Sequence, residues 1–257
     1  MTGWRLTGVL LAAALAAGQA SARPVEPGSP DDHAYAYDTQ RQRFMDGAAL
    51  QHRGLSIDVP SWVEDGAFVP LGIELTGARP PVEVLVLRDG EADARIARLQ
   101  IHQWQEPLRL GTRVRLPASQ TLAVLARDID GRVWQAEQAV EVLGSSCLAP
   151  LPPRVDWGEI RLWADVQAGG IALRSLLRHP METGRRPAAE GGRLPRWLLA
   201  RLSIDGATGP VLALEAFEGL AANPLLHLVL PAQVAPVRLD YVDDRGERRL
   251  AQWPHAE

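Results

Sequence analysis

The sequence contains no lysine, and all 27 of its basic residues are therefore arginine. This absence excludes Schiff-base chemistry and any mechanism that needs a lysine as general base. Aromatic residues make up only 5% of the chain, and the formal net charge is -4. Such a chain offers neither the aromatic stacking surface of many nucleic-acid-binding proteins nor a polybasic membrane anchor. We therefore expect no nucleic-acid partner.

Cysteine is almost as scarce, because Cys147 is the single one in the chain. A lone thiol has no partner for an internal disulfide, so it is inert and buried, paired between chains, or used chemically. The preceding residues Gly144, Ser145 and Ser146 are small, which favours an exposed tether. The sequence has no nucleophile elbow, phosphate loop, dinucleotide fingerprint or closely spaced histidine pair. We expect no metal, no cofactor and no enzymatic activity of its own.

Long hydrophobic runs are absent beyond the N-terminus. Residues 1–22 contain Arg5, an apolar run from Leu6 to Ala17, and the small-x-small cleavage site Ala20-Ser21-Ala22, a pattern typical of a signal peptide. No other run approaches the roughly 20 apolar residues that a membrane-spanning helix needs. The sequence thus predicts an exported protein whose mature form has no membrane span.

Turn signals divide the rest of the chain into two sets of short apolar strands. Seven strand patterns lie between Leu55 and Val142, and six more lie between Ile160 and Val242. Asp-Gly and Arg-Gly dipeptides separate several of them, and the proline-rich stretch LAPLPP stands between the two sets. This spacing predicts an all-β fold of two tandem immunoglobulin-like antiparallel β-sandwiches. Most of the tryptophans are expected in the core or at the domain interface, namely most of Trp62, Trp104, Trp134, Trp157, Trp163 and Trp197.

The expected domain boundaries follow from these patterns. They are a signal peptide at 1–22, a leader with a possible short helix at 23–53, a first sandwich at 54–147, a linker at 148–153 and a second sandwich at 154–257. The helix is expected within Asp38–Gln51, with Phe44, Met45 and Leu50 as its apolar contacts.

Several motifs resemble a known pair of proteins. The strings VPSWVEDGAFVPLGIEL (residues 59–75) and RVRLPASQTLAVLARDIDGRVWQAEQAVEV (113–142), with the cysteine that follows, are similar to SoxY. The strings LLRHPMETGRR (176–186), GGRLPRWLL (191–199) and ANPLLHLVL (222–230) are similar to SoxZ. The whole resembles the two subunits of the periplasmic thiosulfate-oxidation carrier fused head to tail, as in the quinoprotein dehydrogenase-associated SoxYZ-like carriers.

The resemblance implies a periplasmic carrier rather than a catalyst. Cys147 matches the SoxY cysteine, which holds sulfur intermediates covalently and presents them to partner enzymes. The implied partners are Sox-type enzymes, a quinoprotein dehydrogenase or a c-type cytochrome. The SoxY cysteine ends its chain in a Gly-Gly-Cys-Gly-Gly arm, whereas here the chain continues through Leu148 and the prolines. The alternative function is an accessory module that docks to a quinoprotein dehydrogenase or cytochrome without thiol chemistry.

The HPMETG motif stands in a stretch rich in arginine. This stretch contains Arg178, Arg185, Arg186, Arg193 and Arg196, and its only acidic residues are Glu182 and Glu190. We hypothesise that it lies close to Cys147, lowers the pKa of the thiol and attracts small sulfur oxyanions. His179 is a candidate to hydrogen-bond or deprotonate that thiol. The alternatives are a solvated hairpin loop for the arginines and a purely structural place for His179, which precedes a proline.

Overall fold

The computed structural model describes residues 34–144, 157–167 and 170–254. The first half contains α1 (Tyr37–Met45), β1 (Leu50–Gln51), β2 (Leu55–Asp58), β3 (Trp62–Asp65), η1 (Gly66–Phe68), β4 (Val69–Leu75), β5 (Val82–Arg88), β6 (Arg95–Ile101), β7 (Leu108–Val114), β8 (Gln120–Arg127) and β9 (Val133–Gly144). The second half contains β10 (Ile160–Gln167), β11 (Gly170–Leu177), β12 (Leu199–Gly206), β13 (Gly209–Ala216), β14 (Leu225–Leu230), η2 (Ala232–Val234), β15 (Val237–Asp243) and β16 (Arg248–Trp253).

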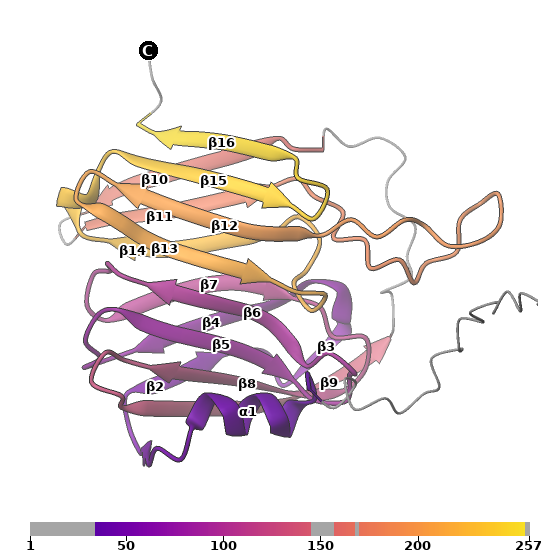
Figure 1. Ribbon diagram of the computed structural model, residues 1–257, viewed down its shortest axis with the longest axis horizontal. Helices are drawn as coiled ribbons and strands as arrows, with labels where there is room; N and C mark the ends of the chain where they lie inside the picture. Colours follow the sequence, from indigo (N-terminus) through magenta and orange to yellow (C-terminus); the bar gives the residue numbers. More distant parts are fainter. Residues whose placement is uncertain (1–33, 145–156, 168–169, 255–257) are drawn as a thin grey trace, which may run out of the picture.

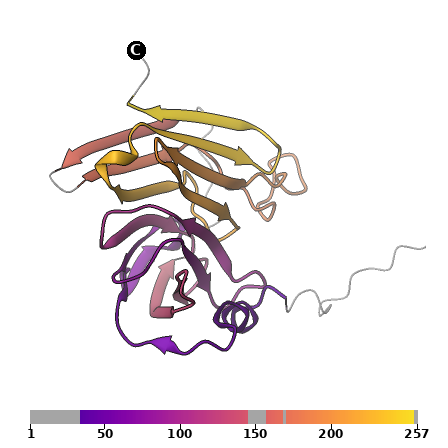
Figure 2. The same ribbon diagram turned by 60° about the vertical axis from the view of Figure 1, so that its left-hand side comes forward.

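The fold prediction is confirmed: each half is a β-sandwich, and the first half lies below the second in both views (Figures 1 and 2). The expected strands are present, most with small shifts at their ends, although the one expected at Thr112–Leu116 is β7 and starts four residues earlier, at Leu108. Strand β4 illustrates why the sequence predicts strands. Its sequence VPLGIEL alternates between the buried residues Val69, Leu71 and Ile73 and less buried neighbours. A period of two is the signature of a strand with one face in the core.

The two sandwiches share both of their sheets. In the 10-stranded sheet, β6 of the first half pairs with β13 of the second over five residue pairs, from Ala97↔Ala216 to Ile101↔Leu212. In the 6-stranded sheet, β7 pairs with β14 through Gly111↔His227 and Leu110↔Leu228. A single hydrophobic core cluster consequently extends through both halves. The sequence patterns left open whether the two sandwiches pair with each other, and the structure shows that they do.

The predicted helix is shorter than its sequence window. Helix α1 ends where Asp46 adopts a left-handed backbone conformation, with φ at 45°. Its Phe44 is buried, as expected, in a small second cluster that includes Leu85 and Leu125. Leu50 belongs to the short strand β1 instead of the helix. Within the described ranges no helix is long and apolar enough to cross a membrane.

Of the six tryptophans expected in the core or at the interface, Trp134 is buried in the core and Trp104 packs against it, whereas Trp62 and Trp163 are exceptions. Trp62 is 56% exposed and Trp163 is 48% exposed, so neither belongs to the core. Both stand on strands whose alternate residues face inward, Val63 beside Trp62 and Leu162 beside Trp163. The pleat therefore directs these two indole rings to the outer face. Strands β1, β3 and β16 were not expected; β16 begins with two arginines and lies at one edge of the sheet.

Candidate functional site

The segment that carries the cysteine leaves the first sandwich at the end of β9. Gly144, the last residue of β9, is exposed and is paired with Asp65 of β3 in a parallel ladder. Ser145, Ser146 and Cys147 lie outside the described residues, as do the predicted signal peptide and the linker at 148–153. Cys147 is three residues beyond Gly144, so its Cα lies within about 11 Å of the Gly144 Cα. Gly144 is therefore the last described residue before the cysteine.

The HPMETG turn lies toward the same end of the molecule, on the side where β9 ends in Figure 1. Strand β3, which pairs with the end of β9, runs directly into Gly66, whose carbonyl accepts a hydrogen bond of 2.8 Å from the Leu116 amide. The adjacent Arg115 donates to the carbonyl of Met181, at 3.0 Å. A short chain of contacts thus connects the base of the cysteine tether to the turn, although the distance from the thiol itself stays a prediction.

The turn is held by His179 and Asn223. The Asn223 amide donates to the carbonyl of His179 at 2.8 Å, and the His179 amide donates to Oδ1 of Asn223 at 3.2 Å. Met181 and Asn223 both have a left-handed backbone, with φ of 48° and 50°. Two motifs that are 44 residues apart, HPMETG and the Asn-Pro strand, therefore form one local structure. Each motif supplies both a donor and an acceptor to this structure, so the two motifs hold each other in place.

His179 is buried and is hydrogen-bonded through Nδ1, whereas its Nε2 has no hydrogen-bond partner among the described residues. Its Nδ1 accepts a hydrogen bond of 3.2 Å from the Met181 amide, and its Nε2 lies 4.0 Å from Oδ2 of Asp243. Its side chain is only 4% exposed. Burial lowers the pKa of the imidazole to about 4, against the opposing effect of Asp243. His179 is thus neutral near pH 7 and has the environment of a structural residue.

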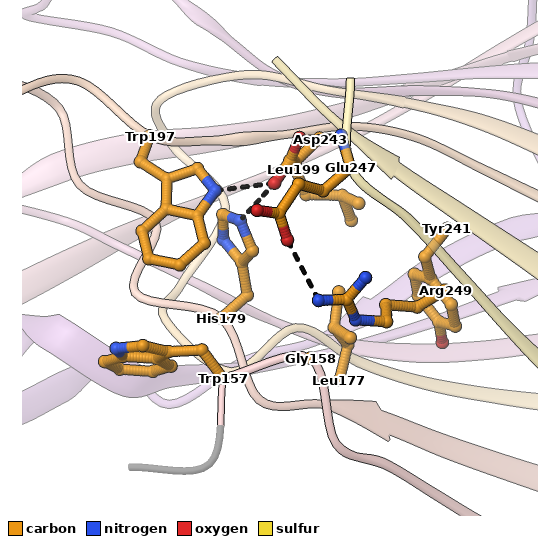
Figure 3. Close-up of a pocket in the computed structure, with 10 residues that line it drawn as sticks. All are labelled: Trp157, Gly158, Leu177, His179, Trp197, Leu199, Tyr241, Asp243, Glu247 and Arg249. Atoms are coloured by element: carbon orange, nitrogen blue, oxygen red, sulfur yellow. Dashed lines mark hydrogen bonds and ion pairs between the residues drawn. The ribbon is translucent and has the colours of Figure 1, made fainter. Parts of the chain in front are cut away.

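A small cavity lies behind this imidazole (Figure 3). Its volume is about 20 Å³, which accommodates a single water. Trp197 stands edge-on to both Trp157 and His179, with ring centroids 6.1 and 5.0 Å apart, and donates from Nε1 to Asp243 at 2.6 Å. The residues that line the cavity are Trp157, Gly158, Leu177, His179, Trp197, Leu199, Tyr241, Asp243, Glu247 and Arg249. This cavity is too small for a ligand larger than water.

The expected surplus of positive charge around the turn is not found, because carboxylates from loops elsewhere in the chain reach it. Arg185 forms ion pairs with Glu91 of the first half, at 3.4 Å, and with Glu218 of the second, at 3.0 Å. Arg196 also pairs with Glu218, at 2.8 Å. Sequence inspection of the loop alone missed these acids, since nothing near the motif signals them.

The remaining arginines of the turn behave in three ways. Arg186 forms an ion pair with Glu182 in which both side chains are largely buried. Arg178 pairs with Glu159 at 2.7 Å. Arg193 is exposed and has no ion pair within the part of the chain that the structure describes. Of the residues predicted to surround the thiol, Arg178, Arg185 and Arg186 are therefore each neutralised locally.

Comparison with known proteins gives a consistent result. The family model described as "Sulfur oxidation protein SoxY" matches residues 41–147, and the model "Sulphur oxidation protein SoxZ" matches residues 160–254. No curated protein matches the chain.

Solved structures also match. The sulfur carrier protein SoxY from Chlorobium limicola f thiosulfatophilum has 19% identity and a TM-score of 0.35, over 41% of this chain and 94% of that one. Bovine butyrophilin has 12% identity and a TM-score of 0.22, over 79% of this chain and 99% of that one. The two family matches stand in tandem and together cover most of the polypeptide. The chain therefore belongs to the Sox-type carrier family, as a SoxY domain and a SoxZ domain fused in one protein.

Proposed function

We propose that this protein is a periplasmic carrier on which Cys147 holds a sulfur-containing or other thiol-linked intermediate covalently for redox partner enzymes. The observation that carries the proposal is the position of the SoxY match, which ends at Cys147, the single cysteine of the chain. The surrounding geometry supports it, since β9 brings the chain to an exposed Gly144 three residues earlier. SoxY and SoxZ are carrier proteins rather than catalysts, and we propose no enzymatic activity for the fusion.

The partners belong to the same proposal. They are Sox-type enzymes or, in view of the fused arrangement, a quinoprotein dehydrogenase or a c-type cytochrome. The internal position of Cys147 limits how deeply the thiol enters such a partner. A loop that must return to the protein can extend by only about three residues, or about 10 Å. The partner's reactive group should accordingly lie in a shallow site.

Intact-mass analysis of the protein purified from its own cells tests the proposal. We expect a mass adduct on the native chain that is absent from a Cys147→Ser variant, together with complete loss of function for that variant in the source organism. Wild-type function in the Cys147→Ser strain would instead establish the accessory module that docks without thiol chemistry. A Ser146→Ala variant is the matched control, because it changes the tether without removing the thiol.

A further inference from the structure

The ribbon formed by β3 and the end of β9 has an outer face of unusual composition. Its ladder pairs Trp62 with Glu141 and Val63 with Val142, and this register sets Glu64 opposite Leu143. Val63 and Val142 pack against the hydrophobic core. Because side chains alternate along a strand, Trp62, Glu64, Glu141 and Leu143 all point away from the core.

Two of these outward residues are large and apolar. Trp62 is 56% exposed and Leu143 is 63% exposed, and they stand diagonally on adjacent strands, within reach of each other. Exposed apolar residues that stand singly are ordinary on protein surfaces, but tryptophan is among the residues that most often anchor protein contacts, and here it stands next to an exposed leucine. The two glutamates complete the face, and within the described ranges neither has an ion-pair partner.

The length of the tether decides what covers this face. Leu143 is four residues before Cys147, and the Cys147 Cα remains within about 11 Å of the Gly144 Cα. A folded domain of 100 residues has a radius of gyration of about 13 Å. Any enzyme that acts on the thiol is larger than the tether is long, so its surface must meet the surface from which the tether leaves.

We infer that Trp62, Leu143, Glu64 and Glu141 form the docking surface for the enzyme that processes the Cys147 adduct. This inference rests on the proposed function. The rim of that enzyme's active site should present an apolar recess for Trp62 and Leu143, with arginine or lysine side chains beside it for the two carboxylates. The apolar pair supplies affinity, and the carboxylates steer the approach.

Steady-state kinetics with the loaded carrier as substrate tests this inference. The carrier, purified with its adduct, is added at increasing concentration to a soluble extract of the source cells, and loss of the adduct mass is followed. We expect Trp62→Ala to raise the apparent KM about tenfold or more and leave the maximal rate nearly unchanged, as for a central interface residue. Leu143→Ala should have a smaller effect in the same direction.

The chain offers matched controls for both substitutions. Trp163 on β10 is 48% exposed and Leu250 on β16 is 57% exposed, and both belong to the second half. Trp163→Ala and Leu250→Ala should change the apparent KM by less than about twofold. Iodoacetamide should alkylate Cys147 at the wild-type rate in all four variants, which separates docking from any change in the thiol itself.

The carboxylates provide a second readout that a merely structural role would not affect. The apparent KM of the wild-type carrier should rise with ionic strength, and Glu64→Gln combined with Glu141→Gln should weaken that dependence. If the adduct is consumed with an unchanged apparent KM in both Trp62→Ala and Leu143→Ala, the inferred docking surface is wrong, but the proposed function still holds. A purified carrier without any adduct on Cys147 removes both.

Discussion

Both halves of the protein contribute residues to one end of the molecule and use it differently. The SoxY domain ends there in a two-stranded ribbon whose outer face exposes Trp62 and Leu143. The SoxZ domain contributes a loop whose Met181 and His179 are buried and whose arginines are paired with acids. At this end the SoxY domain exposes apolar side chains to solvent, whereas the SoxZ domain holds its loop in place through burial and ion pairs. The difference teaches that an arginine-rich stretch of sequence is not by itself a free positive surface.

The largest expected effect comes from the β6–β13 pairing, the seam where the two halves are joined. Ile101 of β6 is completely buried, belongs to the core cluster shared by both halves and pairs with Leu212 of β13. Truncating it to alanine should lower the free energy of unfolding by about 2–5 kcal/mol. Because the halves share both sheets, urea denaturation followed by tryptophan fluorescence should show one transition that moves as a whole.

The control for this substitution is Ile129→Ala. Ile129 is 58% exposed, so its truncation should change the free energy of unfolding by no more than about 0.5 kcal/mol. Two separate transitions in the Ile101→Ala variant, with the later one at its wild-type midpoint, would mean that the two domains fold independently and that the seam is only a contact.

The local part of this architecture could be predicted from sequence. The alternation in VPLGIEL specifies a strand because it matches the pleat, and the Asp89-Gly90 and Asp130-Gly131 signals mark turns because glycine tolerates the positive φ found at both. The shared sheets could not be predicted. The pairing of β6 with β13 joins residues more than 100 positions apart, and a strand pattern does not say which edge it pairs with.

The candidate site divides in the same way. The HPMETG and Asn-Pro motifs are visible in the sequence, and the structure joins them through His179 and Asn223. Glu182 of the loop itself pairs with Arg186, but the other acids that neutralise the loop come from elsewhere in the chain: Glu91, Glu159, Glu218 and Asp244. Charge counted along a segment measures only its own residues, whereas the field at a site sums over everything that folding brings near.

The stability of the protein should depend on pH through His179 of the SoxZ domain. The pKa of His179 is about 4 in the folded protein and 6.5 in the unfolded chain. Between these values the unfolded chain binds a proton that the folded protein does not, so stability rises with pH. The contribution is complete above pH 6.5 and is lost as the pH falls through about 4. It amounts to at most about 3 kcal/mol.

Urea denaturation of the wild type and of His179→Asn at several pH values measures this contribution. Asparagine keeps an acceptor that can reach the Met181 amide but does not titrate. The variant should be less stable than the wild type near pH 7, and its stability should depend less on pH between 4 and 6.5. His227, whose pKa is also lowered by burial, remains in both proteins and cancels in the comparison. Parallel pH profiles would show that His179 does not titrate as its burial implies.

The smallest effect is expected on the reactivity of Cys147, and it tests whether the arginines of the SoxZ domain influence the thiol. If unpaired arginines lowered the pKa of Cys147, replacing Arg185 with glutamine would slow its alkylation by iodoacetamide at pH 7. The Arg185 side chain, however, is 54% exposed and lies between two carboxylates, Glu91 and Glu218. Exposed charges contribute little at a distance because water and salt screen them. We therefore expect Arg185→Gln to change the alkylation rate by less than about twofold. Arg193→Gln, which removes an exposed arginine of the same loop, is the matched comparison. A tenfold slower reaction in Arg185→Gln alone would instead mean that this guanidinium turns from its carboxylates toward the thiol, and that the second half prepares the cysteine which the first half presents.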